Sequence, residues 1–290
     1  MFKHWLKIFS DLIKLKITTA VSFTTAVGYL LATESLSVQI FIPVIGIFLL
    51  ACGSSALNEY QERRTDGLMS RTNGRPLPAY KIQTKTALFI IFFMTAAGIA
   101  ILYFGTNLPA TLLGIFALLW YNGIYTPLKR KTAFAAVPGA LIGAIPPMVG
   151  WVAGGGYILD PQIILIAGFF FIWQVPHFWL LLLLSSDDYE RAGLPSLTDV
   201  FSVAQISRIT LMWMLTTAIT SLIIINFGAV HSLFVKVGVV IFAIGLGWQA
   251  VKILRVERKS LSFKNAFISI NVFALLVTVF LSIDKLINVL

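Results

Sequence analysis

The longest uncharged segment of the chain covers residues 86–128, which contain no Asp, Glu, Lys or Arg. One bilayer crossing takes about 20 apolar residues, so this segment is long enough for two transmembrane helices. Gly105 and Pro109 supply a turn between them, because glycine tolerates positive φ and proline fixes φ and lacks an amide proton. The chain is therefore predicted to be an integral membrane protein.

The other uncharged stretches predict further crossings. The full set of spans lies near residues 17–33, 37–57, 86–104, 108–125, 133–154, 161–184, 208–228, 231–253 and 265–283. Charged residues make up only 12% of the chain, about half of the usual share in a soluble domain, which leaves little material for a separate soluble domain. The sequence therefore predicts an all-α polytopic membrane protein with nine transmembrane helices in one domain, residues 1–290.

The distribution of basic residues predicts the topology independently of hydropathy. When the loops are assigned to alternating sides from an inner N-terminus, 20 of the 22 Lys and Arg residues fall on the inner side. Only Lys236 and Lys285 fall outside, which is a strong positive-inside pattern. We therefore expect a cytoplasmic N-terminus and a C-terminus on the outer side. The net charge of +10 then reflects topology, and no nucleic-acid partner is predicted.

The N-terminal segment favours a bacterial inner membrane. No small-x-small cleavage site follows the apolar run at 17–33, so we interpret this run as the first span and not as a removable signal. The preceding residues contain Asp11 and no Arg, which is atypical of a mitochondrial transit peptide. Cys52 is the only cysteine, which excludes an intramolecular disulfide and a Cys-based metal site.

A first group of polar side chains follows the second span. If that helix extends beyond the membrane, Asn58, Glu62 and Asp66 lie at i, i+4 and i+8 and form one stripe of oxygen donors. Mg²⁺ is commonly held by one or two carboxylates together with substrate phosphates. Arg71 and Arg75, also four residues apart, suit phosphate oxygens. This group predicts a diphosphate site that is held through Mg²⁺.

A second acidic group, Asp187 and Asp188, follows the sixth span directly. Four spans separate the two groups, so we expect two similar halves whose acidic loops meet on the inner face and share Mg²⁺ ions. The alternative is that these carboxylates only mark the aqueous end of a transmembrane helix.

Four segments carry a family resemblance. They are Asn58 to Leu77 with its Met69-Ser70-Arg71-Thr72 string, Tyr125-Thr126-Pro127-Leu128-Lys129-Arg130, Gly143-Ala144-Ile145-Pro146-Pro147, and Trp173-Gln174-Val175-Pro176-His177-Phe178 leading to Asp187-Asp188-Tyr189. In this order, over about residues 15–200, they resemble the UbiA superfamily of intramembrane prenyltransferases, and more narrowly its haem-farnesylating branch. The resemblance implies that the nine helices form a UbiA-like bundle.

The resemblance also implies an activity. The farnesyl group of farnesyl diphosphate would be transferred to a vinyl group of haem B, with addition of water, to give haem O and diphosphate. Mg²⁺ is the implied cofactor, with Asn58, Glu62, Asp66, Asp187 and Asp188 as its ligands and as catalytic residues. Arg71, Arg75, Lys129 and Arg130 are the implied diphosphate-binding residues. The expected partners are the lipid bilayer and a haem A synthase or terminal oxidase that receives haem O.

Two ring side chains are further candidates. Tyr125, at the inner end of the fourth span, is expected to stabilise an allylic cation through its ring face, unless it is only an interfacial belt residue. His177 is the one histidine inside an apolar span, and ionisable groups at membrane depth are usually functional. We expect it to ligate the haem iron or orient the porphyrin, and the alternative is a helix-packing role.

The chain departs from the family pattern at several positions. Gln61, Glu62 and Arg64 stand where the first motif usually carries further aspartates, and an arginine cannot bind Mg²⁺. In the second motif Arg191 and Ala192 replace the repeated aspartate, so only Asp187 and Asp188 are assigned there.

Two other functions are alternatives to haem farnesylation. One is a related prenyltransferase that acts on a quinone precursor or a chlorin. The other is a small-solute transporter, since membrane bundles with internal symmetry often move solutes. The acidic groups lie at one membrane face and not at the midplane, which disfavours transport.

Overall fold

The computed structural model describes residues 2–33, 37–227, 230–254 and 259–289, and within these ranges it is helical without strands. Nine helices in the described part are long and apolar enough to cross a membrane, and each predicted span overlaps one of them. They are Leu15–Ala32, Val38–Asp66, Thr84–Gly105, Leu108–Leu128, Ala133–Ala153, Pro161–Leu183, Val203–Asn226, Leu233–Lys252 and Phe263–Ile287. The predicted seventh span ends at residue 228, and the topology count includes Arg255 and Arg258; these three positions lie outside the described residues.

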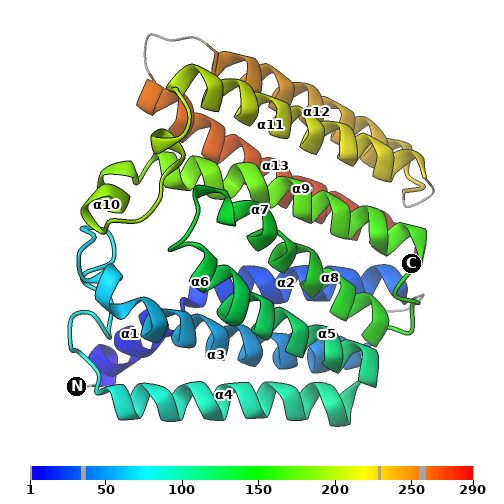
Figure 1. Ribbon diagram of the computed structural model, residues 1–290. Helices are drawn as coiled ribbons and strands as arrows, with labels where there is room; N and C mark the ends of the chain where they lie inside the picture. The colour runs from blue at the N-terminus through cyan, green and yellow to red at the C-terminus, as the bar shows by residue number, and fades with distance from the viewer. Residues whose placement is uncertain (1, 34–36, 228–229, 255–258, 290) are drawn as a thin grey trace.

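In the labels of Figure 1, the single-helix spans are α2 (Leu15–Ala32), α4 (Thr84–Gly105), α9 (Pro161–Leu183), α11 (Val203–Asn226), α12 (Leu233–Lys252) and α13 (Lys259–Val289). The second span joins η1 (Val38–Ile40) to α3 (Phe41–Asp66). The fourth consists of α5 (Leu108–Leu119), η2 (Trp120–Tyr125) and α6 (Thr126–Leu128), and the fifth of η3 (Ala133–Ala135), α7 (Ala136–Gly139) and α8 (Leu141–Ala153). Short helices α1 (Phe2–Leu12), α10 (Ser186–Arg191) and η4 (Leu197–Asp199) complete the described elements.

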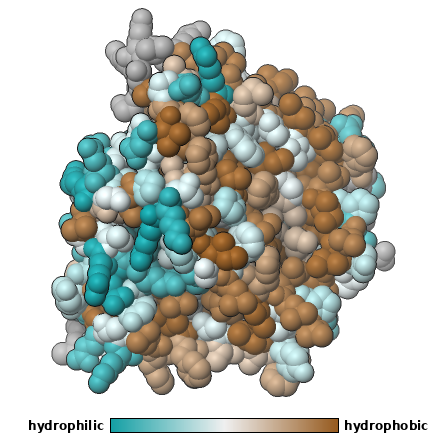
Figure 2. Space-filling model, viewed as in Figure 1, coloured by the Kyte–Doolittle hydropathy of each residue, from teal (hydrophilic) through white to brown (hydrophobic). Residues whose placement is uncertain are grey.

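The helices run side by side, and the short elements gather at one end of the bundle. Figure 1 shows α1, α10 and the connection between α3 and α4 together at this end, whereas the last turns of α13 lie toward the other. Figure 2 shows hydrophilic side chains concentrated at the same end of the molecule. We call this region the polar end. Which membrane face it occupies stays a prediction.

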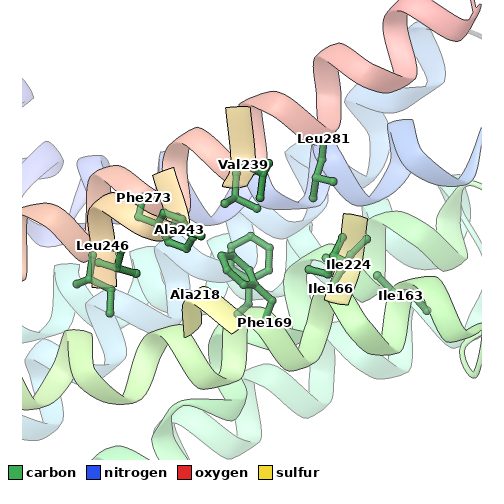
Figure 3. Close-up of a cluster of buried hydrophobic side chains, with 14 of the residues drawn as sticks. Ile163, Ile166, Phe169, Ala218, Ile224, Val239, Ala243, Leu246, Phe273 and Leu281 are labelled. Atoms are coloured by element: carbon green, nitrogen blue, oxygen red, sulfur yellow. The ribbon is translucent and has the colours of Figure 1, made fainter. Parts of the chain in front are cut away.

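Close helix packing depends on small residues. A Cβ added at Gly28 on α2 would lie 2.0 Å from the Pro147 carbonyl oxygen on α8. One added at Gly150 on α8 would lie 1.9 Å from the carbonyl oxygen of Thr25. Glycine at such positions lets two membrane helices approach backbone to backbone. The largest apolar cluster includes residues of α3, α4, α5, α8, α9, α11, α12 and α13, and Figure 3 shows the part of it around Phe169.

Three features depart from a simple series of straight spans. Helix α3 has 26 residues, which is about 39 Å at 1.5 Å per residue and exceeds a hydrocarbon layer of about 30 Å. The fourth and fifth spans, each predicted as one helix, are divided, and η2 is π-helical. Helix α1, which the sequence did not predict, buries Ile8 and Leu12 and exposes Trp5 and Leu6, as an amphipathic interfacial helix does.

Candidate active site

The stripe predicted at the end of the second span is present. Asn58, Glu62 and Asp66 all belong to α3, because the helix continues to Asp66. Each of the three accepts a hydrogen bond or an ion pair from a different basic residue. Lys14 Nζ lies 2.7 Å from Asn58 Oδ1, Lys129 Nζ lies 2.5 Å from Glu62 Oε1, and Arg75 lies 2.7 Å from Asp66 Oδ2. Three cations from three separate segments therefore converge on one face of α3.

Lys14 is a site residue that the sequence did not reveal. It lies between α1 and α2 in a left-handed backbone conformation (φ 52°), which turns the chain so that the ammonium group reaches α3. Burial, and after it the positive charge of Arg75, lowers the pKa of Lys14 to about 7. Burial is the larger of these two causes, because it disfavours the charged ammonium form. A bound diphosphate would favour the charged form of Lys14.

The second acidic group contacts the first, as predicted, but the contact is made through the backbone. Asp188 on α10 accepts hydrogen bonds from the amides of Ser70 (2.8 Å) and Arg71 (3.1 Å). Arg191, from the same short helix, donates to the hydroxyl of Ser70. We call these contacts the α10 clasp. The Ser70 amide, with help from that of Arg71, holds the pKa of Asp188 below its ordinary value, so the clasp is present at neutral pH and weakens as the pH falls through that lowered pKa.

Asp188→Ala should loosen the 67–83 connection. Without this acceptor the Ser70 and Arg71 amides lose the contacts that tie the connection to α10, so trypsin should cleave faster after the exposed Arg71. The matched control is Asp187→Ala, which removes the same charge from an exposed neighbour whose carboxylate accepts from Ser186 in the same short helix. Equal cleavage rates for the two variants would show that the α10 clasp does not hold the 67–83 connection in place.

The remaining predicted phosphate ligands occupy different places. Arg75 is bound to Asp66, whereas the Arg71 side chain is exposed. Arg130 donates to the carbonyl oxygen of Gln61 and thereby ties α6 to α3. Tyr189 on α10 lies near the same charged side chains. Burial of the phenol, and after it the negative charge of Glu62, raises the pKa of Tyr189 to about 12. Its hydroxyl group therefore remains a hydrogen-bond donor at neutral pH.

The five predicted Mg²⁺ ligands do not form a preassembled metal centre. Among the described residues, no three His, Cys, Asp or Glu side chains lie close enough together to hold a metal ion. Glu62 and Asp66 are nevertheless oxygen donors one turn apart, and both face cations that a diphosphate could take over. This donor set fits Mg²⁺, which commonly takes one or two carboxylates and completes its coordination with phosphate oxygens and water.

Tyr125 is a buried residue and not an interfacial belt residue. It ends the π-helical segment η2, and such segments are frequent at functional sites. Its ring stacks on Phe178 at 5.5 Å, and Lys129 Nζ lies 5.1 Å from its centroid. Asn122 fixes this segment by bonding to Ser54 and Gln61 on α3. Tyr125 therefore joins the charged stripe to the aromatic side chains of α9.

Gly139 on α7 makes room for this ring. A Cβ there would lie 2.5 Å from Tyr125 Cδ2 and Cε2. Gly139→Ala is expected to displace the ring and to cost about 1–3 kcal/mol, which is a few degrees in thermal midpoint. Gly123→Ala, in η2 itself, is the matched control because its Cβ meets open space. The measurement is the thermal unfolding midpoint of each variant in the same detergent. Similar midpoints for Gly139→Ala and Gly123→Ala would contradict the expectation.

His177 directly precedes Phe178 on α9. Its Nδ1 is 2.7 Å from Asn271 Oδ1 on α13, and its ring is 5.6 Å from that of Phe178. A continuous row of rings thus runs from Lys129 through Tyr125 and Phe178 to His177. The row therefore has the Lys129 ammonium group at one end and an imidazole at the other.

Residues that the sequence interpretation missed include Lys14, Gly139, Tyr189 and Glu59. Glu59 is fully buried and accepts the Leu77 amide at 2.9 Å, so it anchors the 67–83 connection to α3. The sequence could have indicated Glu59, because it directly follows Asn58 in the first polar group. No local pattern marked Lys14 or Gly139.

Comparison with known proteins defines the class. Residues 21–271 match the UbiA prenyltransferase family, and the chain belongs to this family. It is similar to proteins named protoheme IX farnesyltransferase. The one from Oleidesulfovibrio alaskensis is 30% identical over 98% of both chains, and the one from Christiangramia forsetii is 33% identical over 97% of this chain and 94% of its own. The one from Geobacter sulfurreducens is 44% identical over 59% of this chain and 63% of its own.

Solved structures share the fold at low identity. A structure reported for digeranylgeranylglyceryl phosphate synthase has a TM-score of 0.79 at 14% identity and covers 97% of this chain and 98% of its own. A UbiA homolog from Archaeoglobus fulgidus, bound to GPP and Mg²⁺, has a TM-score of 0.68 at 15% identity, with coverage of 95% and 99%. The predicted UbiA-like bundle is thereby confirmed. Membership of a prenyltransferase family decides against the transporter alternative.

Proposed function

We propose that this chain transfers the farnesyl group of farnesyl diphosphate to a vinyl group of haem B, with addition of water, and releases haem O and diphosphate. The observation that carries the proposal is the row of rings between the charged stripe of α3 and His177. The names of the bacterial relatives support the choice of substrates. The same relatives support a bacterial inner membrane, and a haem A synthase or a terminal oxidase is the proposed recipient of the product.

The reaction separates charge, and the residues of the site suit that separation. The allylic carbon–oxygen bond breaks, and its electron pair leaves with the diphosphate. Lys14, Arg71, Arg75, Lys129 and Arg130 are proposed to hold the leaving group electrostatically. The vinyl π electrons attack the allylic carbon, and water adds to the resulting cation and then loses a proton. The Tyr125 ring face is proposed to stabilise the allylic cation before attack.

Asn58, Glu62 and Asp66, together with Asp187 and Asp188, are the proposed holders of Mg²⁺ in the complex with diphosphate. When bound, the ion would supply positive charge to the leaving group. Arg75 and Lys129 neutralise Asp66 and Glu62 in the described structure. We propose that they transfer to the phosphate oxygens when the substrate enters. His177 is proposed to bind the haem iron.

The test is product formation by the purified protein in lipid vesicles. Farnesyl diphosphate, haem B and Mg²⁺ are added, and extracted haems are analysed by mass spectrometry. We expect haem O with wild-type protein and none with empty vesicles. A panel with a quinone precursor and a chlorin as acceptors runs in parallel. Prenylation of one of these acceptors without haem O would overturn the proposal in favour of a related prenyltransferase.

A further inference from the structure

The hydrogen bond between His177 and Asn271 links helix α13 to the site. Asn271 lies on α13, beyond the segments that resemble family motifs. Its Oδ1 lies 2.7 Å from His177 Nδ1, and its Nδ2 donates to the carbonyl oxygen of Phe267, one turn earlier on α13. Both ends of the Asn271 amide are therefore engaged.

These two bonds fix which imidazole nitrogen carries a proton. A carbonyl oxygen can only accept, so the amide group that faces Phe267 must be the NH₂ group. The amide oxygen therefore faces His177, and because it too only accepts, Nδ1 must be protonated. In the neutral imidazole the lone pair then lies on Nε2. Within the described part of the chain, no hydrogen bond engages Nε2.

The surroundings hold the ring in this orientation. Trp173, one turn earlier on α9, donates from Nε1 to the carbonyl oxygen of Ile270 at 3.1 Å, which sets Asn271 opposite His177. The rings of Trp173 and Phe267 lie 5.0 and 5.2 Å from the imidazole and restrict its rotation. The imidazole is half-buried, so it is not sealed within the core.

We propose that Asn271 is a positioning residue for the haem substrate: it keeps His177 in the Nδ1–H tautomer and presents the Nε2 lone pair to the haem iron. Histidine ligands of metals almost always donate their second ring nitrogen in this way, and loss of the acceptor typically weakens metal binding by about 10–100-fold. The inference rests on the proposed haem function and adds to it a residue of α13.

The experiment is a titration of detergent-purified protein with ferric haem, followed by its absorption spectrum. His177→Ala should lose the spectrum of an imidazole-ligated haem. Asn271→Leu should weaken haem affinity about tenfold or more and shift the spectrum toward that of His177→Ala. Asn271→Asp should restore binding and lower the reduction potential, because a carboxylate acceptor makes the imidazole more basic. Asn226→Leu is the matched control, since Asn226 on α11 donates to the carbonyl oxygen of Leu222, four residues earlier on the same helix.

The possible failures are distinguishable. Absence of haem binding by the wild type would overturn the haem function and, with it, this inference. An unchanged spectrum for His177→Ala would overturn iron ligation. In a third outcome, His177→Ala loses the spectrum of an imidazole-ligated haem, but Asn271→Leu keeps the wild-type haem affinity and spectrum. This outcome would overturn the positioning role of Asn271 and leave iron ligation by His177 intact. If Asn271→Leu does not fold, an unchanged reduction potential in Asn271→Asp overturns the inference.

Discussion

Asp66→Asn is expected to lower kcat for farnesyl transfer by about 10²–10³-fold, the usual cost of removing one group that stabilises transition-state charge. Asp66 is buried on α3, where it pairs with Arg75 and accepts through one of its oxygens. The substitution keeps the shape of the side chain and removes the negative charge. The site loses a proposed Mg²⁺ ligand. It also loses the carboxylate that orients the Arg75 guanidinium group.

The measurement is haem O formation at saturating farnesyl diphosphate, with the thermal midpoint recorded in parallel. Breaking a buried ion pair also destabilises the fold, so only protein with an intact unfolding transition is compared. Glu190→Gln is the matched control, because it removes one negative charge from an exposed position on α10 near the same site. If Asp66→Asn and Glu190→Gln turned over at the same rate, Asp66 would have no part in the chemistry.

Removal of divalent metal is expected to have the largest effect, with turnover falling to background in excess EDTA and returning on addition of Mg²⁺. Within the described chain no group of acidic side chains could hold a metal alone. Mg²⁺ should therefore bind mainly together with the diphosphate, and its apparent affinity should rise with the concentration of farnesyl diphosphate.

Ferric haem binding provides the internal control for this experiment. His177 lies at the far end of the row of rings, so EDTA should leave the haem spectrum unchanged while product formation stops. Full turnover in excess EDTA would mean that the basic residues stabilise the leaving group without a metal ion. In that case the proposed role of Asn58, Glu62 and Asp66 as Mg²⁺ holders would be wrong.

The spans and the α3 stripe were predictable because they depend on local geometry. A bilayer demands about 20 apolar residues for each crossing, and a helix places residues four apart on one face. These two rules predicted the nine spans and the common face of Asn58, Glu62 and Asp66 without any knowledge of tertiary contacts. The π-helical form of η2 was not predicted, and the bonds of Asn122 within it to Ser54 and Gln61 on α3 are tertiary contacts that local spacing does not reveal.

The sequence by itself determined the number of crossings, the predicted orientation of the chain and the kind of residue at the site. Tertiary structure alone decided which residues meet there. Lys14 reaches Asn58 across 44 positions of the chain, Asp188 reaches Ser70 across 118, and Asn271 reaches His177 across 94. Hydrophobic spacing carries no information about such contacts, because they arise from the packing of whole helices. The same packing gives Glu62 and Asp66 their cations and gives His177 its acceptor.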